Sequence, residues 1–576
     1  MKIETNNLIV RVCGIALTAV TILIILRIWC GNEFDIFHPM SFLGGDETSY
    51  MAEVKMMLDE GTWLKSNYLG APYGTDRSTN LSYYLFNDVH LLSFIWVKIF
   101  KNVALAVNLT FFTLIFLNGF SMYFLLRIRK IGVFASCAGS VLYAFEPYVL
   151  MRNTGHIMLS ATYTIPIAFL ICLWIMEDRE FLSVKKVCNK YNIIVVLFAF
   201  LIANSGIGYY MFFSCLLILT AGLMASFSDK NLNGLWKSVK TILTIFVAFC
   251  ISISGFWVNI LRNKDEIGTA VRSMGDIEIY SLKISRLFIP PYATGIQKLD
   301  DIFSAYGSVA VCQTETTEFL GLVGIAGILI MMYYFLSDNK DREIQTATKL
   351  TIVTLIYGTI GGLCVFVFLF VTNLARCTNR MSVYIFCMSI FCAIKVCENI
   401  KRKLCDNKKK IIWIIAVAVI LVIGVKSQLK VTSKLDNTQA KETSIELKSM
   451  IEEIEAKVPD DTAVYQLPNQ TYPTGGFVNN MFPNAEFMPY LFSSTLRFSY
   501  GATEGEEAYQ LNTGISSMKI EDAKQVLLEN GYKGILIDVY AYTEEEWRLL
   551  LQSMQDEYGE ADIVSSSGRW VYYDVE

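Results

Sequence analysis

The first apolar stretch of the sequence is LIVRVCGIALTAVTILIILRIW, residues 8–29, in which Arg11 and Arg27 are the only charged side chains. A helix needs about 20 mostly apolar residues to cross a bilayer, and this stretch has that length. It is too long for the core of a signal peptide, and no small-x-small cleavage site follows it. We therefore expect a signal anchor that stays in the membrane, with a cytoplasmic N-terminus.

The composition of the chain indicates that the whole molecule is a membrane protein. Among 576 residues, 53% are hydrophobic and only 18% are charged, and the mean hydropathy is +0.42. A chain this apolar is typical of an integral membrane protein and not of a soluble one. The net charge of -4 is small and spread over many loops, so it favours no polyanionic partner and excludes nucleic acid.

Cysteine and histidine usage argues against two kinds of site. Most of the fourteen cysteines fall inside apolar segments, which is typical of packing residues and not of a disulfide framework. The three histidines, His38, His90 and His156, occur without CxxC or HxxxH spacing, so a zinc site is not expected. A divalent cation bound by carboxylates stays open, with Asp46 as a potential ligand.

Further apolar segments predict a polytopic protein. They lie near 103–126, 132–150, 157–176, 191–205, 207–226, 238–261, 317–336, 350–373, 381–397 and 411–426. With the first segment they make about eleven transmembrane helices. We assign residues 1–426 to this all-α transmembrane domain.

Basic clusters decide how the ambiguous segment 83–100 lies. The clusters are Arg127/Arg129/Lys130, Lys185/Lys186/Lys190, Lys230/Lys237/Lys240, Lys340/Arg342/Lys349 and the Lys-rich run 401–410. If 83–100 does not cross, all of them fall on the cytoplasmic side, as the positive-inside rule requires. We therefore predict that 83–100 is a helix lying along the outer membrane surface.

This topology places three segments outside the plasma membrane: 31–102, 262–316 and 427–576. Residues 46–61 of the first carry apolar side chains at helical spacing. The last segment is polar and predicts a small extracytoplasmic α/β domain. Its predicted strands are 463–467, 534–539 and 570–574, and its predicted helices are 440–457, 519–530 and 543–557.

The stretch LGGDETSY, residues 43–50, places two adjacent carboxylates just outside the membrane. Asp46 and Glu47 are therefore candidate catalytic groups, able to accept a proton from a substrate hydroxyl. An alternative of equal weight is that Asp46 is only the N-cap of the following helix.

Candidate binding residues come from two other outer loops. Arg376 and Arg380 lie four apart, so they share a face if the loop is helical and can clamp a phosphate, although interfacial arginines also anchor lipid headgroups. Arg152 and His156 lie at the outer mouth between two spans, where a histidine is more often a solvated or capping group.

Two further residues are secondary candidates, and the aromatic side chains of the first outer loop have two readings. Glu318 starts a span, where the helix dipole alone explains an acidic residue, and His90 lies on the surface helix. The aromatic residues suit stacking on sugars, but membrane interfacial belts are the commoner reason for them. They are Trp63, Tyr68, Tyr73, Tyr83 and Tyr84.

Several motifs resemble a known superfamily over nearly the whole chain. They are Gly44-Gly45-Asp46-Glu47, Gly70-Ala71-Pro72-Tyr73-Gly74, Arg152-Asn153-Thr154-Gly155-His156 with Pro166, Pro290-Pro291, Glu318-Phe319-Leu320-Gly321, Arg376 with Arg380, the segment 531–538 and the segment 567–573. The arrangement resembles the GT-C polytopic glycosyltransferases, and in particular the bacterial YfhO-like membrane proteins that are labelled glycosyltransferases or sugar translocases.

The resemblance implies transfer of a hexosyl or related group, with inversion, from a polyprenyl-phosphate donor to a cell-envelope glycan or polymer. It maps the catalytic acidic residue of the first outer loop onto Asp46, and onto Glu47 beside it. The adjacent Asp46-Glu47 is not the Asp-x-Asp or Glu-x-Asp pair of many metal-dependent members, so metal dependence is left open, and no Trp-Trp-Asp acceptor motif is present.

Two other functions are compatible with the sequence. A transporter or flippase of lipid-linked sugars would use the same arginines without a base, although no internal repeat of the kind typical of transporters is visible. A non-catalytic envelope-assembly protein would bind polymer through its C-terminal domain.

Overall fold

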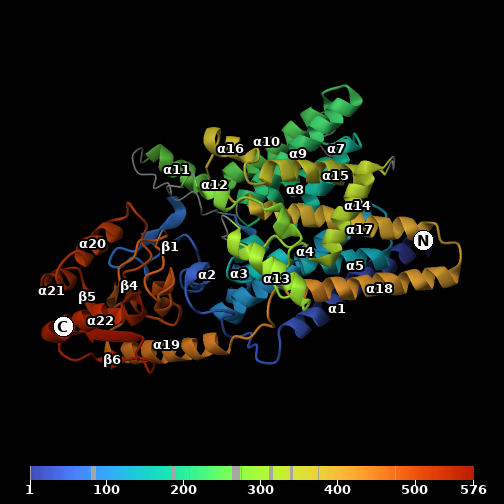
Figure 1. Cartoon of the computed structure of the whole chain (residues 1–576). Coiled ribbons are helices and arrows are strands. Elements are labelled where there is room, and N and C mark those ends of the chain that lie inside the picture. Colours follow the sequence, from blue (N-terminus) through green and yellow to red (C-terminus); the bar gives the residue numbers. More distant parts are fainter. Residues whose placement is uncertain are drawn as a thin grey trace.

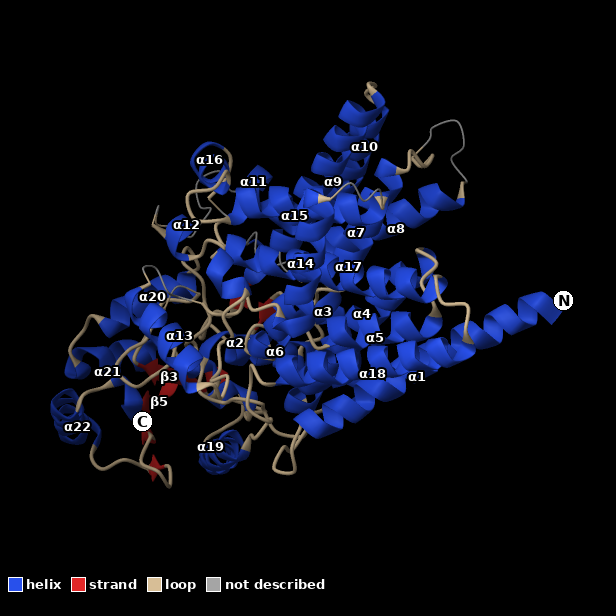
Figure 2. Cartoon of the chain, turned by 45° about the vertical axis from the view of Figure 1, so that its right-hand side comes forward, coloured by secondary structure: helices blue, strands red, loops and turns tan. Residues whose placement is uncertain are grey.

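The computed structural model describes residues 2–79, 86–182, 189–206, 208–262, 273, 275–310, 315–337, 341–373, 375–473 and 475–575. The described chain forms a bundle of long helices joined at one end to a C-terminal α/β region (Figure 1). The strands gather in that region and in the loop that follows the first helix, and the rest is helical (Figure 2).

The helices of the bundle follow the predicted apolar segments. They are α1 (Lys2–Trp29), α4 (Val103–Ile128), α5 (Val133–Ala144), α6 (Pro147–Arg152), α7 (Thr164–Met176), α8 (Lys190–Asn204), α9 (Gly208–Asp229), α10 (Asn233–Ser252), α14 (Gly321–Leu336), α15 (Arg342–Gly358), α17 (Ser382–Arg402) and α18 (Asn407–Leu429). Among the described residues, seven spans are long and apolar enough to cross a membrane, one of them α5 continued by α6. Three shorter apolar helices, α7, α8 and α14, accompany them.

The predicted span 350–373 is wrong in its bounds. Its helix, α15, begins earlier, because the Asp341 side chain accepts hydrogen bonds from the first free amides of the helix. It ends at Gly358, because the chain turns back at Gly361, which has a φ of 69° that favours glycine. A separate short helix, α16 (Cys364–Phe370), follows.

The ambiguous segment contains the helix α3 (Asp88–Phe100), which has 13 residues and is too short to span. It packs on α2 (Gly45–Asp59) and α4 through one buried face, while Leu91, Ile95 and Ile99 are exposed on the other. This is the amphipathic pattern of a surface helix. Its contact with a membrane surface stays a prediction, and residues 80–85 lie outside the described part.

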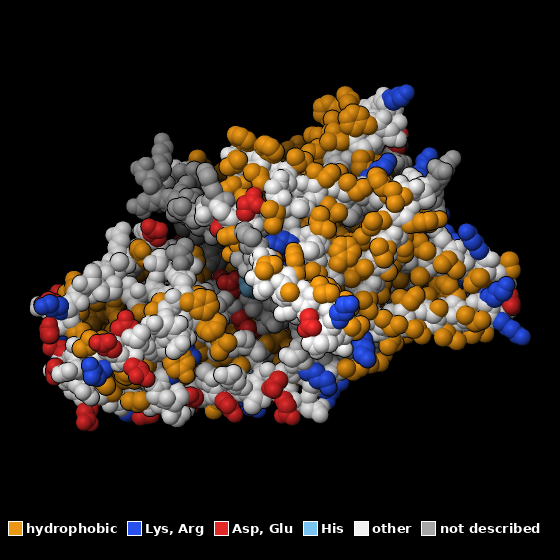
Figure 3. Space-filling model, viewed as in Figure 1, with side chains coloured by type: hydrophobic (Ala, Val, Ile, Leu, Met, Phe, Trp, Pro, Cys, Tyr) orange, Lys and Arg blue, Asp and Glu red, His pale blue; other side chains and the backbone are white. Residues whose placement is uncertain are grey.

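Three of the predicted basic clusters meet at one end of the bundle. The Arg402 guanidinium donates to the carbonyl oxygen of Lys130 at 2.7 Å, and both Arg129 and Lys395 pair with Glu343 at the start of α15. Lysine and arginine side chains mark this end, opposite the C-terminal region, and apolar side chains cover the bundle between them (Figure 3). The predicted topology requires these three clusters to lie on one side, and the topology itself stays a prediction.

The C-terminal region is a five-stranded mixed sheet with helices. Its elements are α19 (Thr438–Lys457), β3 (Ala463–Leu467), β4 (Arg497–Phe498), α20 (Glu507–Ser516), α21 (Ile520–Glu529), β5 (Tyr532–Asp538), α22 (Glu544–Tyr558), β6 (Ile563–Val564) and β7 (Trp570–Asp574). The strand order is β4-β3-β5-β7-β6, with β3 parallel to both neighbours and β7 antiparallel to both of its own. All three predicted strands and all three predicted helices are present. The division into two domains at residue 427 stays a prediction.

The first outer loop is built into this C-terminal sheet. A short hairpin of β1 (Lys65–Ser66) and β2 (Thr75–Asp76) carries Ala71 at its tip, and Ala71 is fully buried among C-terminal residues. The amide of Ala71 donates to the carbonyl oxygen of Phe498 at 2.9 Å, and the amide of Phe498 donates to that of Tyr68 at 2.8 Å. The hairpin tip therefore pairs alongside β4 at the edge of the sheet.

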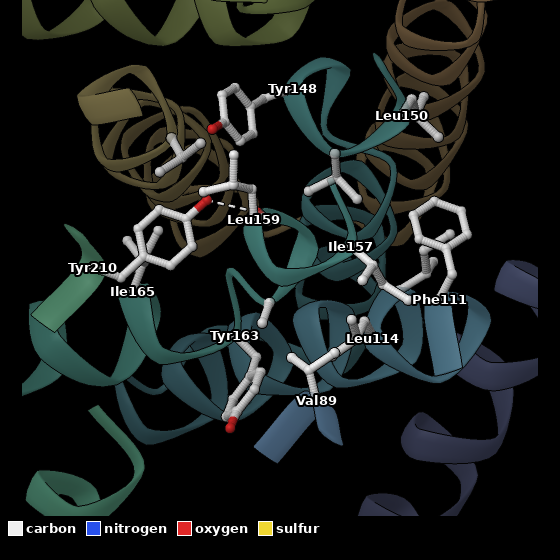
Figure 4. Close-up of a cluster of buried hydrophobic side chains, with 14 of the residues drawn as sticks. Val89, Phe111, Leu114, Tyr148, Leu150, Ile157, Leu159, Tyr163, Ile165 and Tyr210 are labelled. Atoms are coloured by element: carbon white, nitrogen blue, oxygen red, sulfur yellow. Dashed lines mark hydrogen bonds between the residues drawn. The ribbon is translucent and has the colours of Figure 1, made fainter. Parts of the chain in front are cut away.

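A buried apolar cluster supports the loop between α6 and α7. Ile157 of this loop lies near Phe111 and Leu114 of α4, whereas Leu159 lies near Tyr148 and Tyr210 (Figure 4). The hydroxyl of Tyr210 donates to the carbonyl oxygen of Leu159 at 2.6 Å. The loop that carries His156, and follows Arg152 at the end of α6, is therefore held firmly on the helices below it.

Candidate active site

Two glycines bring the chain into α2. Gly44, with a φ of 125°, is the N-cap and makes no side-chain capping bond, and the amide of Gly45 donates to the carbonyl oxygen of Pro483. The N-cap alternative for Asp46 is therefore wrong. Asp46 is the second residue of α2, in the first turn, where the helix dipole favours a carboxylate. Its side chain is 68% exposed.

His156 is the partner of Asp46. The ring Nε2 of His156 lies 3.5 Å from a carboxylate oxygen of Asp46. Partial burial lowers the pKa of His156, and the charges of Arg152 and Arg380 lower it further, against the raising effect of Asp46 and Glu315. The imidazole is therefore neutral at pH 7. All four charged groups act on this one ring.

Glu47 lies in different surroundings from its neighbour. Its buried carboxylate accepts a hydrogen bond from the Thr154 hydroxyl at 2.7 Å and one from the Ser41 amide at 3.4 Å. Burial raises the pKa of Glu47 to about 7, although both hydrogen bonds oppose this. Glu47 thus ties α2 to the loop that carries His156.

Arg152 is buried and paired. Its guanidinium donates to the Glu315 carboxylate and lies 5.1 Å from the ring centroid of Tyr148. The side-chain amide of Asn379 donates to the same carboxylate oxygen of Glu315. Burial tends to raise the pKa of Glu315, but Arg152 and Asn379 outweigh it and the net shift is downward. Glu315 therefore neutralises Arg152.

Arg380 differs from Arg152 because it forms no ion pair with a carboxylate of the described residues, although its charge also acts on Glu315. It lies in the short helix η5 (Thr378–Met381), and its guanidinium carbon lies 4.3 Å from the ring centroid of Tyr209. Within the described part of the chain it has no ion-pair partner, and its buried Nε donates no hydrogen bond. A half-buried cation held by an aromatic ring is ready to receive an anion.

Arg376 does not share this position. The loop is not helical at Arg376, and its guanidinium pairs with Asp276 in α12 (Asp276–Ile279). It also lies 5.1 Å from the ring centroid of Tyr280. The structure thus brings Arg152, and not Arg376, together with Arg380 around His156.

The secondary candidates lie apart from Asp46. His90 lies 2.8 Å from the Glu53 carboxylate and stacks on Trp63, in a buried cluster that includes Arg77. Glu318 is buried, and burial raises its pKa to about 7. Among the described residues, no group of three or more His, Cys, Asp or Glu residues could hold a metal ion.

Sequence reasoning missed several residues of the site. Glu315, Tyr148, Tyr209 and Thr154 each contact a candidate residue, and Asn379 contacts Glu315. Glu315 stands three residues before Glu318 in the sequence, and nothing in the sequence indicated that Glu315, and not Glu318, would contact Arg152. Tyr148 and Tyr209 carry no signal, because aromatic residues are common throughout this chain.

The site therefore combines an exposed carboxylate, a neutral imidazole and two arginines, one of which has no ion-pair partner among the described residues. A family model described as a domain of unknown function, DUF6311, matches residues 89–423. The chain belongs to the DUF6311 family. The match includes Arg152, His156 and Arg380 of this DUF6311 protein and leaves out Asp46 and the C-terminal region.

Solved structures establish the fold of the DUF6311 protein. The alignment with the crystal structure of ArnT from Cupriavidus metallidurans in the apo state covers 97% of this chain and 97% of the ArnT chain, at 12% identity and with a TM-score of 0.54. The same protein bound to undecaprenyl phosphate covers 97% of this chain and 98% of its own at 11% identity, also with a TM-score of 0.54. No curated protein sequence matches the chain.

A third structure, of the arabinofuranosyltransferase AftD from Mycobacteria, covers 98% of this chain and 41% of its own at 12% identity, with a TM-score of 0.53. The predicted GT-C fold is confirmed by these neighbours. At such low identity the likeness concerns the fold alone.

Proposed function

We propose that this DUF6311 protein is an inverting membrane glycosyltransferase that uses a polyprenyl-phosphate sugar donor. The observation that carries the proposal is the set of charges around His156. Glu315 neutralises Arg152, whereas Arg380 retains its positive charge without a carboxylate partner among the described residues. A phosphate supplies the missing negative charge and accepts charge-assisted hydrogen bonds.

Asp46 has the position and exposure of a general base. An acceptor hydroxyl that hydrogen-bonds to its carboxylate loses its proton to Asp46 as the hydroxyl oxygen attacks the anomeric carbon of the donor. The bond from that carbon to the phosphate oxygen breaks, and its electron pair leaves with the polyprenyl phosphate. Attack from the side opposite the leaving group inverts the configuration of the anomeric carbon.

The arginines act on the leaving group. Negative charge develops on the bridging phosphate oxygen as the glycosidic bond breaks, and preorganised cations stabilise it without further rearrangement. Arg380 supplies this charge, and Arg152 supports it from the buried side. The neutral His156 hydrogen-bonds to Asp46 or to the donor and keeps Asp46 oriented.

Two further observations support the proposal. The GT-C fold is shared with ArnT, for which a structure with bound undecaprenyl phosphate exists. The Lys- and Arg-rich end of the bundle lies away from α2, the helix that carries Asp46 (Figure 1), which favours a site on the outer face of the plasma membrane. We therefore place transfer outside the cell, onto an envelope glycan or polymer.

The test is transfer by reconstituted protein supplied with radiolabelled polyprenyl-phosphate sugars and envelope membranes as acceptor. Asp46→Asn keeps the shape of the side chain but removes the base, so we expect transfer to fall about a hundredfold or more. Asp301→Asn, an exposed aspartate on α13 (Gln297–Val309), is the matched control and should stay active. Full activity of Asp46→Asn would contradict the proposal, and sugar movement across the membrane without transfer would favour a translocase.

A further inference from the structure

We infer that the acceptor is a saccharide that stacks on Phe477 and Phe482, two exposed aromatic side chains of the C-terminal region beside Asp46. The inference rests on the proposed function and names the class of its second substrate. We call these two residues the aromatic pair.

The aromatic pair belongs to a segment that touches the start of α2. The Gly45 amide donates to the Pro483 carbonyl oxygen, and the Asn484 side chain donates to the Gly45 carbonyl oxygen at 3.4 Å. A Cβ atom added at Gly44 would lie 2.7 Å from the Cβ of Phe482. Asp46 follows directly in the chain, so the aromatic pair lies next to the start of the helix that carries the candidate base.

The rings face solvent although they are large and apolar. Phe477 is 68% exposed and Phe482 is 36% exposed, and their ring centroids lie 4.9 Å apart with the planes at 58°. Single exposed apolar residues are normal on protein surfaces. Two in contact beside a candidate base form an angled apolar wall that favours a binding partner.

The turn that carries the pair is firmly anchored. Val478 and Met481 exchange two backbone hydrogen bonds of 3.1 and 2.9 Å. The Asn480 amide donates to the Tyr540 carbonyl oxygen at 2.9 Å, and the Asn479 side chain donates to that of Ala541 at 2.7 Å. The rings are therefore presented by an ordered turn, which reduces the entropy cost of binding.

The chemistry of this surface suits a saccharide. The C–H face of a sugar ring packs on an aromatic face, while its hydroxyls need polar partners. Asn480 is exposed between the rings in sequence, and Asp46 accepts hydrogen bonds at the edge. A membrane anchor would instead pair such rings with Lys, Arg or Trp, and the segment 475–484 contains none of these.

The experiment measures binding of the full-length protein, in lipid nanodiscs, to an array of hexose, pentose and N-acetylhexosamine tetrasaccharides. We expect the wild type to bind at least one class, and the double variant Phe477→Ala/Phe482→Ala to bind it about tenfold more weakly. Phe477→Trp/Phe482→Trp should restore binding. Phe227→Ala, which removes an 81% exposed ring at the far end of α9, is the matched control and should bind as wild type does.

Three outcomes overturn the inference: wild-type protein that binds no saccharide, wild-type binding in the double alanine variant, or a double variant whose only defect is release of its C-terminal region from the lipid surface. If the wild type binds a saccharide through the aromatic pair but transfers no sugar, the proposed function fails while the inference about the pair stands.

Discussion

Asp46 and Glu47 are neighbours in sequence, but their carboxylates lie in opposite surroundings. One is exposed beside His156, and the other is buried against Thr154. Successive residues of a helix point about 100° apart, so one of two adjacent carboxylates can face solvent while the other faces the core. This difference separates a candidate base from a side chain that positions the loop.

The raised pKa of Glu47 predicts a pH-dependent stability. Between pH 4.5 and about 7 the native state keeps a proton that the unfolded chain has lost, so the wild type loses stability as pH rises through this range. Glu47→Gln cannot ionise and can still accept the Thr154 hydrogen bond. Its stability relative to wild type should therefore rise by up to about 3 kcal/mol between pH 4.5 and 8.

Thermal unfolding of the purified protein in detergent at pH 5 and pH 8 measures this difference. Glu521→Gln, at an exposed position of α21, serves as control and should change Tm equally at both values. A Glu47→Gln variant whose Tm difference from wild type is the same at pH 5 and pH 8 would show that Glu47 is not held neutral.

At the scale of the element, the sequence pattern located the bundle helices but not how closely they pack. Gly327 lies at the middle of α14 where it crosses α17, and a Cβ atom there would lie 2.2 Å from the carbonyl oxygen of Ser389. Backbone cannot move aside as a side chain can. Helix pairs in membranes commonly approach each other through such small residues.

We therefore expect Gly327→Ala to destabilise the protein by about 1–3 kcal/mol, because it forces α14 away from α17. Gly307→Ala is the matched control, since Gly307 lies in the exposed helix α13 with nothing within 4 Å of an added Cβ. There alanine should be neutral or stabilise by about 0.5–1 kcal/mol. Thermal unfolding in detergent compares the two, and equal Tm values would contradict the close packing.

Short strands are a second feature of the fold that the sequence pattern did not predict. The three predicted strands are present as strands of five and seven residues, but β4 and β6 have only two residues each and carry no alternation to detect. Both short strands are edge strands of the sheet. Pairing with a longer neighbour, and not local preference, makes them strands.

At the scale of the whole molecule, charge separates the two ends. Arg129, Lys130 and Arg402 meet at one end of the bundle, and Asp46 and the aromatic pair lie at the other. If the basic end is cytoplasmic, the C-terminal region is outside the cell. The topology is a property of the complete chain, since one additional crossing would reverse every later loop.

Cysteine labelling in intact cells tests this topology. A membrane-impermeant maleimide should label Asp522→Cys, at an exposed position of α21, without permeabilisation. Cys405, an exposed cysteine between α17 and α18, should react only after permeabilisation. Mass spectrometry identifies the modified peptide in each case. Labelling of Cys405 in intact cells would contradict the proposed orientation.

The sequence by itself determined the membrane bundle, the grouping of basic loops and the principal elements of the C-terminal region. These features depend on the length, composition and periodicity of single segments, which can be read locally. Asp46, Arg152, His156 and Arg380 were also named from their own loops. None of these loops indicates which partner each side chain meets.

Only the tertiary structure decided those partners. Arg152 meets Glu315 across 163 residues, and Glu47 meets Thr154 across 107. The hairpin tip at Ala71 joins a sheet whose strands lie more than 390 residues further along the chain. Such contacts depend on how packed helices and strands bring distant loops together, and no local pattern encodes them. That Arg380 has no ion-pair partner among the described residues is therefore visible only in the folded molecule.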